Sequence, residues 1–111
     1  MLEPAAVTAM VQAVLSRILA VCSPERVVLF GSGARGEMTT HSDLDLLVTL
    51  RDDDAIKQAS RSLYKAGPLL KDVAVDIVWL TETAYQRKKL SGGLCEVIAA
   101  EGKILFQVSA S

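Results

Sequence analysis

The glycine-rich segment at residues 31–36 lies very close to the strand expected after it, and this spacing limits the possible folds. The segment reads Gly-Ser-Gly-Ala-Arg-Gly after an apolar, β-branched run, which matches the G-x-G-x-x-G pattern of dinucleotide-binding folds. Only six residues, Glu37 to Ser42, separate it from the next expected strand. A parallel crossover through a helix needs at least about ten to twelve residues. A dinucleotide-binding fold is therefore excluded.

A P-loop is excluded by the two residues that follow the same segment. A P-loop has lysine and then serine or threonine after its last glycine, whereas Glu37 and Met38 stand at these positions. What remains is a tight turn that leads into one or two helical turns.

The turn itself can bind phosphate groups. Gly31 allows the backbone to approach a ligand closely, and the Ser32 hydroxyl and nearby N–H groups can donate hydrogen bonds to phosphate oxygens. Arg35 can donate to the same ligand or brace the turn. The alternative is an ordinary glycine-rich turn without a ligand.

The hydrophobic pattern predicts a single α/β domain over residues 1–111. Alternating or β-branched apolar segments predict strands, and apolar residues at helical spacing predict helices. The expected helices are 5–22, 52–66, 81–89 and 94–101, the expected strands are 26–31, 43–50 and 73–80, and residues 104–106 are a candidate edge strand. Asp52 and Thr81 are expected to cap their helices, and Gly102 to end the last one.

Charge and composition exclude several classes of partner. The formal net charge of −1 provides no general attraction to nucleic acid or to an anionic membrane. Polar residues interrupt the apolar segment 5–22 and no basic segment precedes it, so we expect neither a signal peptide nor a membrane span. Cys22 and Cys95 are expected to be reduced core thiols in a cytoplasmic protein.

Two aspartates suggest a metal site next to the turn. Asp43 and Asp45 lie on one face of the expected strand, with Cα atoms roughly 6–7 Å apart. Such carboxylates can converge on a pair of divalent cations, and without cations their repulsion should raise at least one pKa. The alternative is a half-exposed strand with acidic residues on its outer face.

A third aspartate stands alone in an apolar segment. Asp76 is the only charged residue of the strand expected at 73–80, and we expect its side chain to be buried on the face opposite Ile77 and Trp79. A buried carboxylate needs a cation or strong hydrogen-bond donors. Asp76 is therefore expected to complete the metal site and to accept a proton from an attacking hydroxyl. The alternative is a structural ion pair with a core arginine or lysine.

The combined pattern resembles the minimal nucleotidyltransferase family of the DNA polymerase β superfamily. The matching residues are the segment 31–36, the Ser-Asp-Leu-Asp-Leu segment at 42–46 and the lone Asp76, so the resemblance covers nearly the whole chain. It implies a polymerase β-like fold, with a small mixed sheet of three to four strands flanked by helices. His41 departs from the family pattern, in which an acidic residue is common at this position.

The resemblance also implies a reaction and a role for each residue. Family members transfer a nucleoside monophosphate from a nucleoside triphosphate to a hydroxyl, using two Mg²⁺ ions. By position, Asp43 and Asp45 would bind both ions, and Asp76 would bind the catalytic ion and activate the nucleophile. Gly31 and Ser32 would hold the triphosphate.

The resemblance further implies a partner. Minimal members resemble the antitoxins of toxin–antitoxin modules whose toxin is a HEPN-type ribonuclease, and they transfer AMP from ATP to a tyrosine of that toxin. The apolar surface of residues 5–22 agrees with a protein partner. Two alternatives stay open, namely transfer to a small molecule such as an aminoglycoside, and an antitoxin that acts by binding alone.

Overall fold

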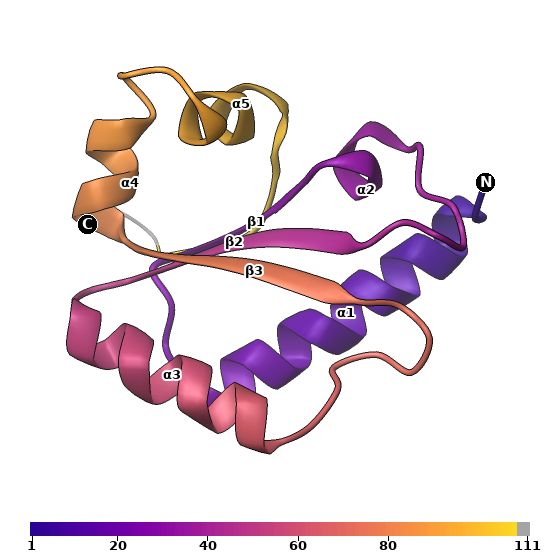
Figure 1. Ribbon diagram of the computed structural model, residues 1–111, viewed down its shortest axis with the longest axis horizontal. Helices are drawn as coiled ribbons and strands as arrows, with labels where there is room; N and C mark the ends of the chain where they lie inside the picture. Colours follow the sequence, from indigo (N-terminus) through magenta and orange to yellow (C-terminus); the bar gives the residue numbers. More distant parts are fainter. Residues whose placement is uncertain (109–111) are drawn as a thin grey trace.

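The structure, a computed structural model, describes residues 1–108 as a four-stranded sheet with helices on both faces (Figure 1). Strand β1 pairs antiparallel with both β2 and β4, whereas β2 pairs parallel with β3, so the sheet is mixed and its order is β3-β2-β1-β4. The elements in chain order are α1 (Pro4–Val21), β1 (Arg26–Phe30), α2 (Ser32–Arg35), β2 (Leu44–Leu50), α3 (Asp53–Lys65), β3 (Val75–Thr81), α4 (Glu82–Lys88), α5 (Leu94–Glu101) and β4 (Lys103–Gln107).

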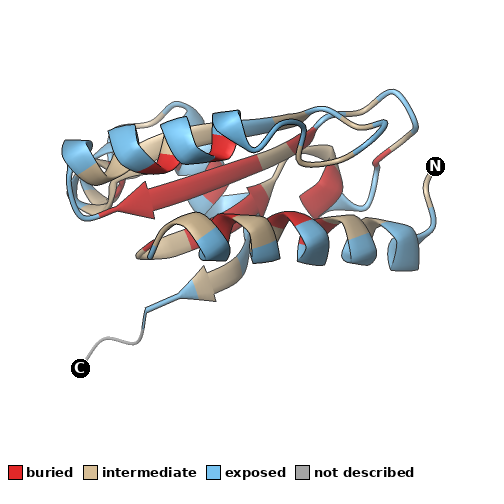
Figure 2. Ribbon diagram, turned by 90° about the horizontal axis from the view of Figure 1, so that it is seen from below, coloured by how far each residue is buried: buried red, intermediate tan, exposed pale blue. Residues whose placement is uncertain are grey.

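The sheet separates two hydrophobic cores. Helices α1 and α3 cover one face, and α4 and α5 lie on the other (Figure 1). The first core is the larger, and alternate residues of β2 (Leu44, Leu46 and Val48) enter it. Leu47 enters the second core, with Tyr85 and Ile98. Figure 2 shows the outer faces of the two long helices as exposed and the strand between them as buried. Alternation along β2 therefore assigns each side chain to one of the two faces.

The small mixed sheet of three to four strands that the resemblance implies is confirmed, with four strands, and the element ends agree within two residues. The predicted caps are also present: the Asp52 carboxylate accepts a hydrogen bond from the Ala55 amide at 2.8 Å, and the Thr81 hydroxyl accepts one from the Ala84 amide at 3.1 Å. The candidate edge strand at 104–106 is β4, which pairs with β1.

Gly102 ends α5 for a different reason from the one expected. Its φ of −66° is ordinary extended backbone, not the left-handed conformation of a glycine cap. A Cβ atom at this position would lie 2.4 Å from Val28 Cγ1 and 2.5 Å from the Ile98 carbonyl oxygen. Glycine is needed here because the end of α5 packs directly against β1.

Helix α1 leaves much of its apolar surface uncovered. Val11, Val14 and Ile18 form its buried stripe, whereas Leu19 is 39 % exposed and several alanines are exposed. Within residues 1–108, α1 is the one helix long and apolar enough to cross a membrane by length and composition alone. The same composition suits a helix that packs on a sheet with one side and faces a partner with the other.

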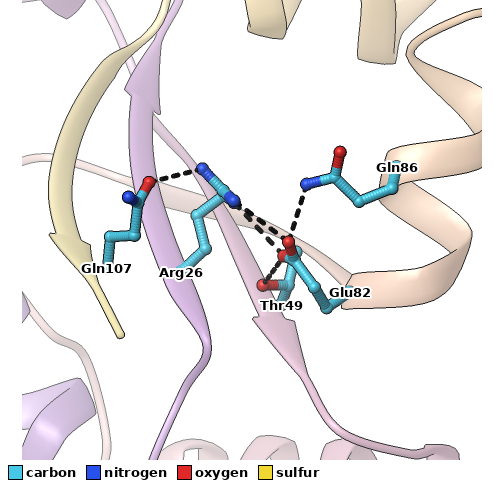
Figure 3. A network of polar contacts seen from close by, with 5 residues as sticks. All are labelled: Arg26, Thr49, Glu82, Gln86 and Gln107. Carbon is cyan, nitrogen blue, oxygen red and sulfur yellow. Dashed lines mark hydrogen bonds and ion pairs between the residues drawn. The ribbon is translucent and has the colours of Figure 1, made fainter. Parts of the chain in front are cut away.

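A polar network fixes α4 to the sheet at the end of β2 (Figure 3). Arg26 of β1 donates two hydrogen bonds to Glu82, from Nε to Oε1 at 3.2 Å and from Nη2 to Oε2 at 3.0 Å. Glu82 also accepts from Thr49 Oγ1 at 2.8 Å and from Gln86 Nε2 at 2.7 Å. Arg26 Nη1 donates to Gln107 Oε1 at 2.7 Å, which extends the network to β4.

We predict that Glu82→Gln lowers the free energy of unfolding by about 1–2 kcal/mol at pH 7, because it removes a partly buried, charge-assisted pair. Burial acts to raise the pKa of Glu82, but hydrogen bonds from Arg26, Gln86 and Thr49 outweigh it, so the pKa lies below its usual 4.5. The stabilisation is therefore present above pH 4.5 and is lost as the pH falls through the lowered pKa.

Urea titrations of both proteins from pH 7 to below the lowered pKa of Glu82 measure this difference. Asp72→Asn, which changes an exposed carboxylate in the loop before β3, is the control and should leave stability unchanged. Equal midpoints for wild type and Glu82→Gln at pH 7 would contradict the prediction.

Candidate active site

Two of the predicted carboxylates lie side by side at one end of the sheet. Asp45 of β2 and Asp76 of β3 are register partners in the parallel pair, and Asp45 is also paired with Phe30 at the end of β1. Leu47 and Val78, two residues further along each strand, face the α4–α5 core. Both aspartates therefore face the α4–α5 side, where neighbouring strands are about 4.8 Å apart.

Asp43 stands just before β2. The strand begins at Leu44, one residue later than expected, so Asp43 lies on the extended segment that enters it and is exposed. Leu44 alone lies between it and Asp45, so continued strand alternation places both side chains on the same side. The nearby His41 is exposed, in a turn where its backbone amide donates to Thr39 Oγ1 at 3.2 Å.

The expectation that Asp76 is buried is wrong: its side chain is exposed. The cause is the order of the strands, since β3 is an edge strand and its start is not covered by a helix. The expected alternation is nevertheless present, because Val75, Ile77 and Trp79 pack toward the first core and Val78 and Leu80 toward the second. An exposed Asp76 needs no structural ion pair, and it is accessible to a substrate.

The charges of the neighbouring carboxylates act on the pKa of Asp45. Burial raises the pKa of the half-buried Asp45 above its usual value, and the negative charges of Asp76 and Asp43 raise it further, while Arg35 acts in the opposite direction. The expected rise of one pKa is thus confirmed, although desolvation contributes more than repulsion. A divalent cation bound here would remove the repulsive part.

The donor set fits a divalent cation, but it does not form a closed cage. Carboxylate oxygens are the ligands that Mg²⁺ prefers. Within residues 1–108, no three carboxylate, imidazole or thiolate side chains are close enough to form a ready-made metal site. Asp43 and Asp76 are both exposed, so rotation of their side chains can bring oxygens toward Asp45. The assignment of the three aspartates as metal ligands therefore stays a prediction.

The glycine-rich turn lies directly against Asp45. Gly31 has φ 72° and ψ −152°, and a Cβ atom built on it would lie 2.4 Å from Asp45 Oδ2. Ser32 then begins the single-turn helix α2, in which the Ala34 and Arg35 amides donate to the Gly31 carbonyl, each at 3.1 Å. The predicted short turn is thus present, Gly31 lies against the Asp45 carboxylate, and Ser32 is the next residue of the turn.

Arg35 braces the turn. Its guanidinium is exposed and pairs with Glu37, two residues further on, and with Glu101 at the end of α5, where Nη1 lies 3.6 Å from Oε2. These pairs agree with the bracing role expected for Arg35, and its role in binding a ligand stays a prediction. Sequence analysis missed Glu101, because no local pattern connects residues so far apart. Glu37 could have been found, since it follows Arg35 at a spacing that allows direct contact.

Comparison with known proteins agrees with this geometry. A protein of Methanocaldococcus jannaschii that carries the provisional name protein adenylyltransferase MJ0604 is 29 % identical over 84 residues, which cover 74 % of this chain and 78 % of that protein. A provisionally named nucleotidyltransferase from Sulfolobus solfataricus has the same fold, with a TM-score of 0.59 at 19 % identity over 94 % of this chain and 83 % of that chain.

A second solved structure is similar in fold. It is the crystal structure of a toxin–antitoxin with AMP-PNP, with a TM-score of 0.55 at 24 % identity over 87 % of this chain and 73 % of that chain. The model of the nucleotidyltransferase domain family matches residues 11–105, which include the turn, all three aspartates and most of β4. The chain therefore belongs to the nucleotidyltransferase domain family, the class of enzyme that its sequence pattern resembles.

Proposed function

We propose that this nucleotidyltransferase depends on Mg²⁺, transfers AMP from ATP to a hydroxyl of a partner protein, and thereby acts as the antitoxin of a HEPN-type toxin. The observation that carries the proposal is the register pairing of Asp45 with Asp76 beside the Gly31 turn. This pairing places acidic groups from two strands next to a bend with close backbone access. A cytoplasmic location is part of the same proposal.

Asp43, Asp45 and Asp76 would hold two Mg²⁺ ions. Bound there, the ions would neutralise charge on the triphosphate and on the pyrophosphate that leaves. The protein's own contribution is to position the reactants, because phosphoryl-type transfer requires little covalent chemistry from side chains.

Each reacting group has a residue beside it. Gly31 and Ser32 bind the triphosphate through the turn, and the exposed carboxylate of Asp76 accepts the proton of the acceptor hydroxyl. The hydroxyl oxygen forms a bond to the α-phosphorus of ATP, and the bond from the α-phosphorus to the oxygen that bridges to the β-phosphate breaks. AMP remains on the acceptor and pyrophosphate leaves.

A protein acceptor is supported by three observations. The Methanocaldococcus relative is named for adenylyl transfer to protein, and a structure with the same fold comes from a toxin–antitoxin. The uncovered apolar surface of α1 is also suited to a protein interface. A tyrosine of the toxin is the acceptor we propose.

Label transfer tests the reaction. The purified chain is incubated with Mg²⁺, ATP labelled at the α-phosphate and the product of the neighbouring gene, and we expect label on a tyrosine of that product. The double variant Asp43→Asn/Asp45→Asn should reduce the rate by a factor on the order of 10² or more, since it removes most of the charge that holds the cations.

The matched control is Asp53→Asn/Asp54→Asn, which changes two exposed aspartates of α3 and should retain the wild-type rate. Full transfer by Asp43→Asn/Asp45→Asn would show that the site is elsewhere. Label on an added aminoglycoside and never on protein would replace the proposed acceptor with a small molecule.

Thermal unfolding tests the metal. We predict that Asp45→Asn raises the Tm in metal-free buffer at pH 7 by a small amount, on the order of 2–4 °C, because it removes a carboxylate that is partly desolvated and repelled. Since the pKa of Asp45 is raised, its unfavourable effect should disappear as the pH falls toward its unfolded value near 3.8. Added Mg²⁺ should raise the Tm of the wild type but not that of the variant. A Tm of Asp45→Asn that rises with Mg²⁺ as much as the wild type would argue against this metal site.

Alanine substitutions at two glycines with nearly the same backbone conformation distinguish the effect of backbone strain from the effect of contact with Asp45. Gly31 has φ 72° and ψ −152°, and Gly93, at the start of α5, has φ 79° and ψ −157°, but a Cβ at Gly93 would meet nothing within 4 Å. Gly31→Ala should therefore reduce AMP transfer at least 10-fold beyond Gly93→Ala, because only the first displaces the Asp45 carboxylate. Initial rates at saturating ATP measure this difference, and equal rates for the two variants would contradict it.

A further inference from the structure

The outer edge of β3 is open along its length. Within the described residues, β3 pairs only with β2. The Leu44 amide donates to the Ala74 carbonyl at 2.9 Å, and this pattern directs the backbone groups of Asp76 and Val78 toward β2. Those of Val75, Ile77 and Trp79 therefore point to the open side. The strand also lacks the proline and lysine that commonly protect an edge from pairing.

An apolar groove runs beside this edge on the α1–α3 face. Its volume is about 660 Å³, and its lining residues come from α3, the segment 67–75 and β3. The lining is mainly apolar and includes Leu63, Tyr64, Leu70, Val75, Ile77 and Trp79. Alternate residues of β3 thus contribute to the groove, while their backbone groups face the open edge.

Hydrogen bonds from α1 hold one wall of the groove in place. Arg17 of α1 donates from Nη1 to the Pro68 carbonyl at 3.1 Å and from Nη2 to the Ala66 carbonyl at 3.2 Å. These bonds hold the segment after α3 in place. The groove is consequently a preformed feature, which lowers the cost of binding.

The rim of the groove is basic where it meets α3. Arg61 and Lys65 line a hollow that adjoins the groove and shares Ser60 and Tyr64 with it. Tyr64 is 88 % exposed at this rim, and exposed aromatic side chains are common in protein interfaces. The positive charges of Arg61 and Lys65 favour a bound segment that carries acidic residues near the α3 end of the groove.

The geometry points to the open edge of β3 and its groove as the binding site for an extended segment of the acceptor protein, which adds to the sheet as a fifth strand. This inference rests on the proposed transfer of AMP to protein. Backbone pairing would provide affinity, and apolar side chains at alternate positions would fill the groove. The side chains at the positions between these would face the α4–α5 side of the sheet, and the added strand would lie about 4.8 Å from β3, which carries Asp76. A hydroxyl residue in that set is delivered next to the carboxylate that takes its proton.

Amide hydrogen exchange measured by NMR tests the added strand directly. The isotope-labelled chain is compared alone and in complex with the product of the neighbouring gene. We expect exchange at Val75, Ile77 and Trp79 to slow at least 10-fold in the complex, with no change at Ile104 on the opposite edge strand. This readout needs binding but no turnover, so it decides the inference even if no AMP is transferred.

Two variants test the same surface. Ile77→Pro removes an outward N–H that β2 does not use, and edge strands tolerate proline at such positions. It should weaken partner binding and AMP transfer at least 10-fold, while Mg²⁺ and ATP still raise the Tm as in wild type. Lys65→Glu changes only an exposed side chain, and it should weaken partner binding several-fold relative to the control Lys57→Glu on the same helix.

The outcomes separate this inference from the proposed function. Wild-type AMP transfer with unchanged exchange at β3 and full activity of both variants would overturn the fifth strand alone. A dimer of the free chain in sedimentation equilibrium that Ile77→Pro abolishes would also overturn it, because the edge would then serve a second copy. Complex formation with β3 protected but without AMP transfer would support the strand and contradict the proposed function.

Discussion

The parallel register between β2 and β3 is the constraint on which the site depends. It sets Asp45 opposite Asp76, and a slip of one residue would turn one of the two carboxylates to the other face of the sheet. The register is held by the core beneath, where Leu44 and Leu46 are buried under α1 and α3 and Val75 packs against them. Apolar packing on one face of the sheet therefore positions the acidic side chains on the other face. The same packing offsets the free-energy cost of desolvating the Asp45 carboxylate.

Much of the fold could be predicted because its signals are local. Alternation of apolar residues identified β2 and assigned its two faces, and single capping residues marked the starts of α3 and α4. The short spacing after Gly36 correctly excluded a crossover helix: β1 and β2 are antiparallel, and α2, a single turn that ends before Gly36, is the only helix between them. The role of Gly102 could not be predicted, because it depends on contact with Val28 across the sheet.

The site was predicted in part, for the same physical reason. The grouping of Asp43, Asp45 and Asp76 follows from strand periodicity and pairing, and the raised pKa of Asp45 follows from grouping and burial. The exposure of Asp76 could not be predicted in this way. Apolar sequences occur both in central strands and in edge strands that pair with another molecule, so the sequence of β3 does not show whether its edge is covered. The ion pair of Arg35 with Glu101 depends on tertiary structure alone.

The position of β4 affects how the chain can fold as it is synthesised. Strand β1 is formed early, yet one of its two neighbours consists of residues 103–107, more than seventy residues further along the chain. Contacts between such distant segments are slow to form, and an unpaired strand is prone to association until its neighbour arrives. A nascent chain thus leaves one edge of β1 without its neighbour until residues 103–107 have been synthesised and are free to pair with it.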